Sequence, residues 1–251
     1  MSDTPISPSP AAVSWSDPAR EAAFKAWLAP LIGPQGLQGA TLRLASSDAS
    51  FRRYLRIDTS RGASRIVMDA PPDKEDCHPF VAVQALMHGA GLRVPEILAW
   101  DEAHGFLLLS DLGAQTAIER LDPADPQAAH GWYLQAVDLL VDWQKASRAG
   151  ALPPYDEALL RRELQLFPDW YVARHRSVAL DEKQQAVLAQ AFDTIVAHNL
   201  AVPRVFVHRD FMMRNLIVGG DGRLGVLDFQ DAVCGPITYD IASLMRDAFI
   251  S

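Results

Sequence analysis

The segment His208-Arg209-Asp210-Phe211-Met212-Met213-Arg214-Asn215 combines a carboxylate with a carboxamide, and a second carboxylate, Asp228, follows 18 positions after Asp210. Phosphoryl transfer needs a carboxylate beside the acceptor hydroxyl and metal ions that neutralise the phosphates. Asp210, with His208 in the same loop, could take the hydroxyl proton, while Asn215 and Asp228 offer the hard oxygen ligands that Mg²⁺ prefers. With 7 histidines and two asparagines in the chain, chance produces H-x-D-x-x-x-x-N about 0.005 times. The spacing therefore predicts phosphoryl-transfer chemistry.

Short apolar runs on both sides of this segment predict the elements that hold it. Strands are expected over 205–208, 215–218 and 224–229, and a last helix begins near Pro236. Apolar residues three and four positions apart predict the preceding helices, which cover 128–147, 156–175 and 181–199.

Nearer the N-terminus the pattern is that of a small antiparallel sheet. Alternating or apolar runs predict strands over 41–45, 52–57, 64–70, 96–100 and 105–109. A helix over 79–90 interrupts these strands, and another precedes them over 17–31, with Ser16 as its N-cap and Gly33, Pro34 and Gly36 as its stop.

Composition excludes several classes of protein. The 251 residues are 49% hydrophobic, no run of 18 uncharged apolar residues occurs, and the N-terminus lacks the pattern of a secretory signal. A formal charge of −8 disfavours nucleic-acid binding, and two distant cysteines indicate a reducing compartment. We expect a cytoplasmic globular protein with neither nucleic acid nor membrane as partner.

The fold class that follows is α+β, a small antiparallel β lobe followed by a larger, mainly α lobe. The change in composition at Ser110–Gly113 predicts the boundary. We expect a disordered tail over 1–15, a nucleotide-binding lobe over 16–110 and a catalytic and acceptor-binding lobe over 111–251.

The catalytic segment, together with Val226–Leu244, resembles the aminoglycoside phosphotransferase and choline kinase family of small-molecule kinases. Asp231 and Asp240 match family positions, and Asp240 is expected to brace the catalytic loop. Similarity is greatest to the bacterial kinases of N-acetylmuramate and N-acetylglucosamine, from about Ser46 to the end of the chain. The resemblance implies a protein-kinase-like bilobal fold with ATP and Mg²⁺ as cofactors.

The nucleotide site that the resemblance implies departs from the family at two points. The turn between the first two strands contains no glycine, so serine hydroxyls, backbone N–H groups and arginines would bind the phosphates. The third strand lacks the usual lysine, and Lys74 or an arginine of the turn is the expected replacement. Predicted cofactor-binding residues are Ser46, Ser47, Asp48, Ser50, Phe51, Arg52 and Arg53 of the turn, with Leu109, Ser110 and Leu112 near the adenine.

The acceptor would lie beside the helix over 156–175. Aromatic and acidic side chains suit a sugar ring and its hydroxyls, and arginine suits a lactyl carboxylate. The candidate residues are Arg162, Glu163, Trp170, Tyr171, Arg174, Arg214 and Asp231.

The function implied is an ATP-dependent kinase that phosphorylates the anomeric hydroxyl of these amino sugars in peptidoglycan recycling, acting as a monomer. Two alternatives stay open. One is a kinase of another small acceptor, such as an aminoglycoside, choline or an amino alcohol. The other is a non-catalytic nucleotide-binding regulator, suggested by the missing lysine. Family members usually continue with further helices, so the catalytic lobe is expected to be incomplete at its C-terminus.

Overall fold

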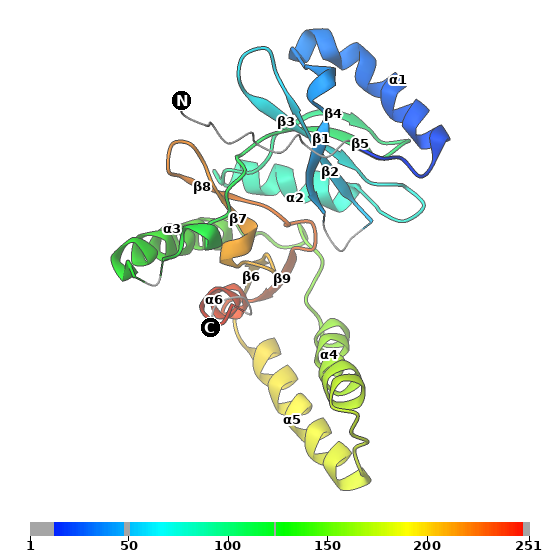
Figure 1. Cartoon of the computed structure of the whole chain (residues 1–251). Coiled ribbons are helices and arrows are strands. Elements are labelled where there is room, and N and C mark those ends of the chain that lie inside the picture. The colour runs from blue at the N-terminus through cyan, green and yellow to red at the C-terminus, as the bar shows by residue number, and fades with distance from the viewer. Residues whose placement is uncertain (1–12, 48–50, 123, 248–251) are drawn as a thin grey trace, which may run out of the picture. The chain divides into compact units, whose positions relative to one another are not determined.

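A computed structural model describes residues 13–47, 51–122 and 124–247 and divides the chain into two units (Figure 1). The first unit contains the chain up to Ala85 together with Arg93–Ala114, and the second contains Leu86–Leu92 and the chain from Gln115 onward. Helix α2 (His78–Gly89) therefore begins in one unit and ends in the other. Residues 1–12 of the predicted tail lie outside the described residues.

The first unit is built on a five-stranded antiparallel sheet with strand order β1-β2-β3-β5-β4. Each predicted strand of this region is present within two residues of its expected bounds. Their bounds are β1 (Arg43–Ser47), β2 (Arg53–Asp58), β3 (Ser64–Asp69), β4 (Ile97–Asp101) and β5 (Phe106–Ser110).

Helix α1 (Pro18–Gln35) covers one face of this sheet (Figure 1). Its Phe24 and Leu28 pack on a row of buried side chains that cross-strand pairing places on one face: Leu55, Val67 and Leu108. The N-cap is Asp17, not Ser16, because the Asp17 carboxylate accepts from the Ala19 N–H. The helix continues past residue 31, through Gly33 and Pro34, and ends at Gln35, where Gly36 with a φ of 63° supplies a left-handed C-cap.

Three residues assigned to the disordered tail pack against this unit instead. The Trp15 ring lies 4.9 Å from the ring of Phe24, and the Arg53 guanidinium stacks 4.1 Å from the Trp15 centroid. Arg53 also donates to the Ser14 carbonyl at 2.9 Å. A single aromatic anchor leaves no periodic signal in the sequence, so sequence alone does not separate residues 13–15 from the tail.

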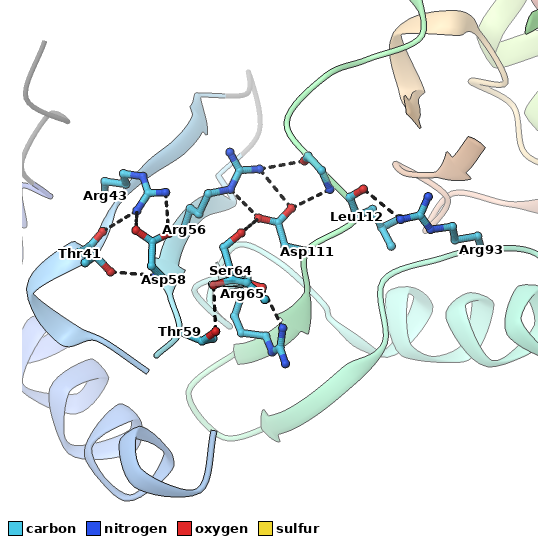
Figure 2. Close-up of polar contacts among 12 residues, drawn as sticks. Thr41, Arg43, Arg56, Asp58, Thr59, Ser64, Arg65, Arg93, Asp111 and Leu112 are labelled. Carbon is cyan, nitrogen blue, oxygen red and sulfur yellow. Dashed lines mark hydrogen bonds and ion pairs between the residues drawn. The ribbon is translucent and has the colours of Figure 1, made fainter. Parts of the chain in front are cut away.

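The buried carboxylate of Asp111 organises the end of β5 (Figure 2). It accepts from Arg56 Nε at 2.6 Å, from Ser64 Oγ at 2.6 Å and from the Gly113 N–H at 3.0 Å. Arg93 donates to the carbonyl of Leu112 at 3.2 Å. The turn after β5 is thus fixed by side chains from β2 and β3.

The second unit combines helices with two small antiparallel sheets, β6–β9 and β7–β8. The elements predicted for this unit are present. Strand β9 is an additional one, which the sequence pattern does not predict because glycine and proline are uncommon inside strands. The bounds are α3 (Pro126–Lys145), α4 (Glu157–Leu166), α5 (Glu182–Ala201), β6 (Arg204–Val207), β7 (Leu216–Val218), β8 (Leu224–Val226), β9 (Val233–Pro236) and α6 (Tyr239–Met245).

The helix predicted over 156–175 is two segments. After α4 the chain continues as the π-helix η3 (Phe167–His175), where Pro168 cannot donate the N–H that an α-helix needs. The segments α4, η3 and α5 form a hairpin that extends away from β6 and β9 (Figure 1). None of the helices in the described part of the chain has both the length and the apolar character that crossing a bilayer requires.

Asp111→Ala is expected to lower the free energy of unfolding by about 3 kcal/mol, because it leaves the half-buried Arg56 guanidinium without its carboxylate. Urea denaturation followed by tryptophan fluorescence measures the loss. Asp73→Ala, in an exposed turn, is the matched control and should change stability by less than about 0.5 kcal/mol. Equal effects of the two substitutions would contradict the role given to Asp111.

Candidate active site

The backbone after β6 is held by a buried carboxylate on α6. Asp240 accepts from the His208 N–H at 2.7 Å and from the Arg209 N–H at 3.0 Å. Burial raises the pKa of Asp240 to about 7, and the two backbone donors oppose that rise by favouring the carboxylate. Arg209 has a φ of 79°, a conformation costly for a residue with a Cβ, so this anchor keeps a strained loop in place.

His208 joins the loop to the end of β8. Its side chain is completely buried, and its Nε2 lies 2.9 Å from the Leu227 carbonyl. Burial lowers the pKa of His208 to about 4, so the imidazole is neutral and donates its Nε2 proton to that carbonyl. A side chain with no exposed surface cannot touch a substrate. The catalytic role predicted for His208 is therefore replaced by a positioning role.

Asp210, Asn215 and Asp228 are linked through backbone groups. Asn215 Nδ2 donates to the Asp210 carbonyl at 2.9 Å, and the Leu227 N–H donates to the Asn215 carbonyl at 2.9 Å. Burial, assisted by the charge of Asp228, raises the pKa of Asp210 above its ordinary value. Asp228 is exposed and has a φ of 60°. The three predicted side chains thus come from one connected loop and hairpin.

A second group of charged residues adjoins the loop. The Arg209 guanidinium forms an ion pair with Glu163 of α4, whose other carboxylate oxygen accepts from the Tyr155 hydroxyl. Asp231 Oδ1 lies 3.9 Å from Arg209 Nη1. Sequence reasoning placed Glu163 and Asp231 among the acceptor residues but missed Tyr155 and the pairing role of Arg209. Only the fold brings Tyr155 close to the loop.

The other predicted acceptor residues are exposed. The Arg174 guanidinium stacks 3.9 Å from the Trp170 centroid, and Tyr171 stacks between Phe167 and His175. Arg162 lies on the exposed surface of α4, and Arg214 is exposed on η4 (Met213–Asn215).

The residues predicted near the phosphates differ in their partners. Ser46 and Ser47 end β1, and Phe51 is exposed beneath the Lys74 ammonium, which is 5.0 Å from the ring centroid. Arg52 pairs with Glu75 and Arg53 with Asp69. Asp48 and Ser50 lie outside the described residues.

The residues predicted near the adenine are largely engaged in the first unit. Leu109 is buried in β5, and Ser110 Oγ accepts from the Glu96 N–H at 2.8 Å. The Leu112 carbonyl accepts from Arg93, as Figure 2 shows.

The side-chain oxygens of Asn215 and Asp228 suit a magnesium ion shared with substrate phosphates. In the described ranges no three histidine, cysteine, aspartate or glutamate side chains gather as a metal cage. Asn215 directs its Nδ2 to the Asp210 carbonyl, so its Oδ1 could serve a metal ion, and Asp228 adds an exposed carboxylate. One or two protein oxygens, completed by phosphates and water, are how Mg²⁺ is usually held.

Comparison with known sequences identifies the family. Residues 41–251 match the phosphotransferase enzyme family. The chain belongs to this family. It is 54% identical over 212 residues to the N-acetylmuramate/N-acetylglucosamine kinase of Pseudomonas aeruginosa, an alignment that includes 84% of this chain and 61% of the relative. The kinase of the same name from Neisseria meningitidis is 44% identical, with coverage of 92% and 68%. The chain thus spans about three-fifths of the Pseudomonas relative.

Solved structures confirm the fold of this chain. An ADP-bound aminoglycoside phosphotransferase, APH(2'')-Ib, superposes with a TM-score of 0.62 at 14% identity, covering 90% of this chain and 75% of that one. The predicted α+β, protein-kinase-like fold is therefore correct.

The buried His208 makes the stability of this chain depend on pH. An unfolded histidine takes up a proton near pH 6.5, whereas folded His208 does so only near pH 4. The contribution of this residue is present above pH 6.5 and is lost as the pH falls towards 4, by up to roughly 3 kcal/mol. His208→Gln retains an amide donor for Leu227 without titrating. The stability difference between wild type and variant should therefore shrink in that pH window in urea titrations, and parallel profiles would contradict the buried neutral imidazole.

Proposed function

We propose that this chain is an ATP-dependent kinase that phosphorylates the anomeric hydroxyl of N-acetylmuramate and N-acetylglucosamine, in the cytoplasmic recycling of peptidoglycan. The observation that carries the proposal is the 44–54% identity to kinases of that name. The loop that holds Asp210, Asn215 and Asp228 is consistent with it, because phosphoryl transfer needs these residue types.

Asp210 is proposed as the residue that orients and accepts the proton of the acceptor hydroxyl. It is half-buried, and its raised pKa makes it a better proton acceptor than an exposed aspartate. An anomeric hydroxyl is more acidic than an ordinary alcohol, so a carboxylate is an adequate base. Asp240 binds the backbone N–H groups of His208 and Arg209, and so fixes the backbone from which the Asp210 side chain extends.

Asn215 and Asp228 are proposed to hold Mg²⁺, which neutralises phosphate charge when it is bound. The φ of 60° at Asp228 is maintained although it is unfavourable for aspartate. Such strain is consistent with a functional requirement on the direction of this side chain.

The acceptor is proposed to lie along α4 and η3. The exposed Trp170 offers a ring for a sugar face, and Arg162 or Arg174 could pair with the lactyl carboxylate of N-acetylmuramate. These arginines disfavour a cationic acceptor such as an aminoglycoside or choline. A non-catalytic regulator has no chemical need for Asp210, Asn215 and Asp228 together. We propose that the enzyme acts as a monomer.

ADP release in the presence of ATP and Mg²⁺ tests the proposal. Turnover is expected with N-acetylmuramate and N-acetylglucosamine but not with kanamycin, choline or a blank without acceptor. Asp210→Asn should fold normally and lose about 10²- to 10⁴-fold in turnover, because the amide cannot accept the proton. Asp138→Asn, on the exposed surface of α3, is the matched control and should keep wild-type turnover.

Turnover with choline or kanamycin alone would replace the amino-sugar assignment by the second alternative. Binding of ATP without turnover of any acceptor would favour the regulator. Wild-type turnover in folded Asp210→Asn would contradict the role of that carboxylate.

A further inference from the structure

A nucleotide cannot bind on the face of the first unit's sheet that α1 covers. Helix α1 fills the face that carries Leu55 and Val67. The β2–β3–β5 register places Tyr54, Met68 and Leu107 in a row on the opposite face, since cross-strand partners point to the same side. A cation that binds phosphates from this sheet must therefore point to the opposite face.

No lysine of the sheet can supply that cation. Met68, on the opposite face of β3, is completely buried and uncharged. The four lysines of the chain lie on α1, α3, α5 and in the turn after β3. The last of these, Lys74, is exposed and stacks over Phe51, with no carboxylate pairing recorded for it among the described residues. Kinases generally fix their phosphate-binding lysine with a glutamate, which Lys74 lacks.

Arg53, the first residue of β2, points to the face of the sheet that α1 covers. It forms an ion pair with the buried Asp69 at 2.5 Å, and Arg20 of α1 binds the other oxygen of the same carboxylate. Both guanidinium groups thus lie on the α1 face. On the opposite face, Arg56 donates to the Asp111 carboxylate and to the Gly113 carbonyl (Figure 2). These arginines serve the fold.

Unlike Lys74 and Arg53, Arg52 is both associated with the face opposite α1 and held by a carboxylate. Its guanidinium interacts with Tyr54, which belongs to the opposite face. Its Nε and Nη2 both lie 3.0 Å from Glu75 Oε2, in the segment between β3 and α2. The two side chains are 13% and 14% exposed. One cation held by one glutamate, largely shielded from water, has the chemistry of the lysine–glutamate pair that fixes phosphates in protein kinases.

We propose that Arg52, held in place by Glu75, is the phosphate-binding cation of the nucleotide site and replaces the lysine missing from β3. This inference rests on the proposed kinase function and deepens it. Arg52 binds phosphate oxygens of ATP through its planar guanidinium, Glu75 positions Arg52, and Arg53 serves only the packing of α1 on the sheet.

The test compares the affinity of the full chain for ATP with its affinity for adenosine by calorimetry, both with Mg²⁺. Arg52→Gln should weaken ATP binding about 10- to 100-fold and leave adenosine binding unchanged, since a charge-assisted hydrogen bond to phosphate is removed. Arg52→Lys should recover part of the ATP affinity. Glu75→Gln should weaken ATP binding less than Arg52→Gln does and should also spare adenosine.

Arg53→Gln is the matched control, one residue away but on the α1 face. It should lower the melting temperature and keep the wild-type ratio of ATP to adenosine affinity. Equal loss of both ligands in Arg52→Gln would show a merely structural role and overturn the inference. A wild-type ratio in that variant would also overturn it while leaving the kinase proposal intact. Failure of the wild-type chain to bind ATP would overturn both.

Discussion

The second unit depends on two hydrogen bonds to one buried carboxylate. Asp240 accepts the backbone N–H groups of His208 and Arg209, and Arg209 adopts a left-handed conformation that costs a residue with a Cβ about 1–2 kcal/mol. Without the carboxylate, two buried donors would lose their acceptor and the loop could relax. The strained backbone therefore persists because Asp240 of α6 stabilises it. The same two hydrogen bonds fix the backbone position of the next residue, Asp210.

The placement of Asp240 follows from strand pairing further back in the chain. Strand β9 pairs with β6, and the segment before α4 joins β9 through the Tyr155 N–H, 2.8 Å from the Cys234 carbonyl. A Cβ at Gly235 would lie 2.8 Å from the Cβ of Tyr155, so only glycine permits this close approach. The start of α4 is thereby fixed, and Glu163 reaches Arg209. One small sheet consequently aligns both the catalytic loop and the helix proposed to border the acceptor.

Features that depend on the spacing of residues close together in the chain could be predicted from the sequence alone. Asp210, Asn215 and Asp228 could be proposed as site residues because their separations are set by one loop and one hairpin. The strands of the first unit were equally readable from alternation. What could not be predicted depends on tertiary contact: the packing of Trp15, the strand β9, and the pairing of Glu163 with Arg209. Likewise, neighbouring Arg52 and Arg53 look equivalent in the sequence, and only the structure shows that Arg52 pairs with Glu75 and Arg53 with Asp69.

The central claim is that phosphate is transferred to the anomeric oxygen of an amino sugar. Phosphorus NMR of the reaction of ATP with N-acetylglucosamine carrying ¹³C at carbon 1 tests it most directly. The account predicts a new sugar-phosphate resonance split by coupling to the labelled carbon, which shows that the phosphate is attached to its oxygen. An unsplit sugar-phosphate resonance would mean that another hydroxyl is the acceptor and would contradict the claim.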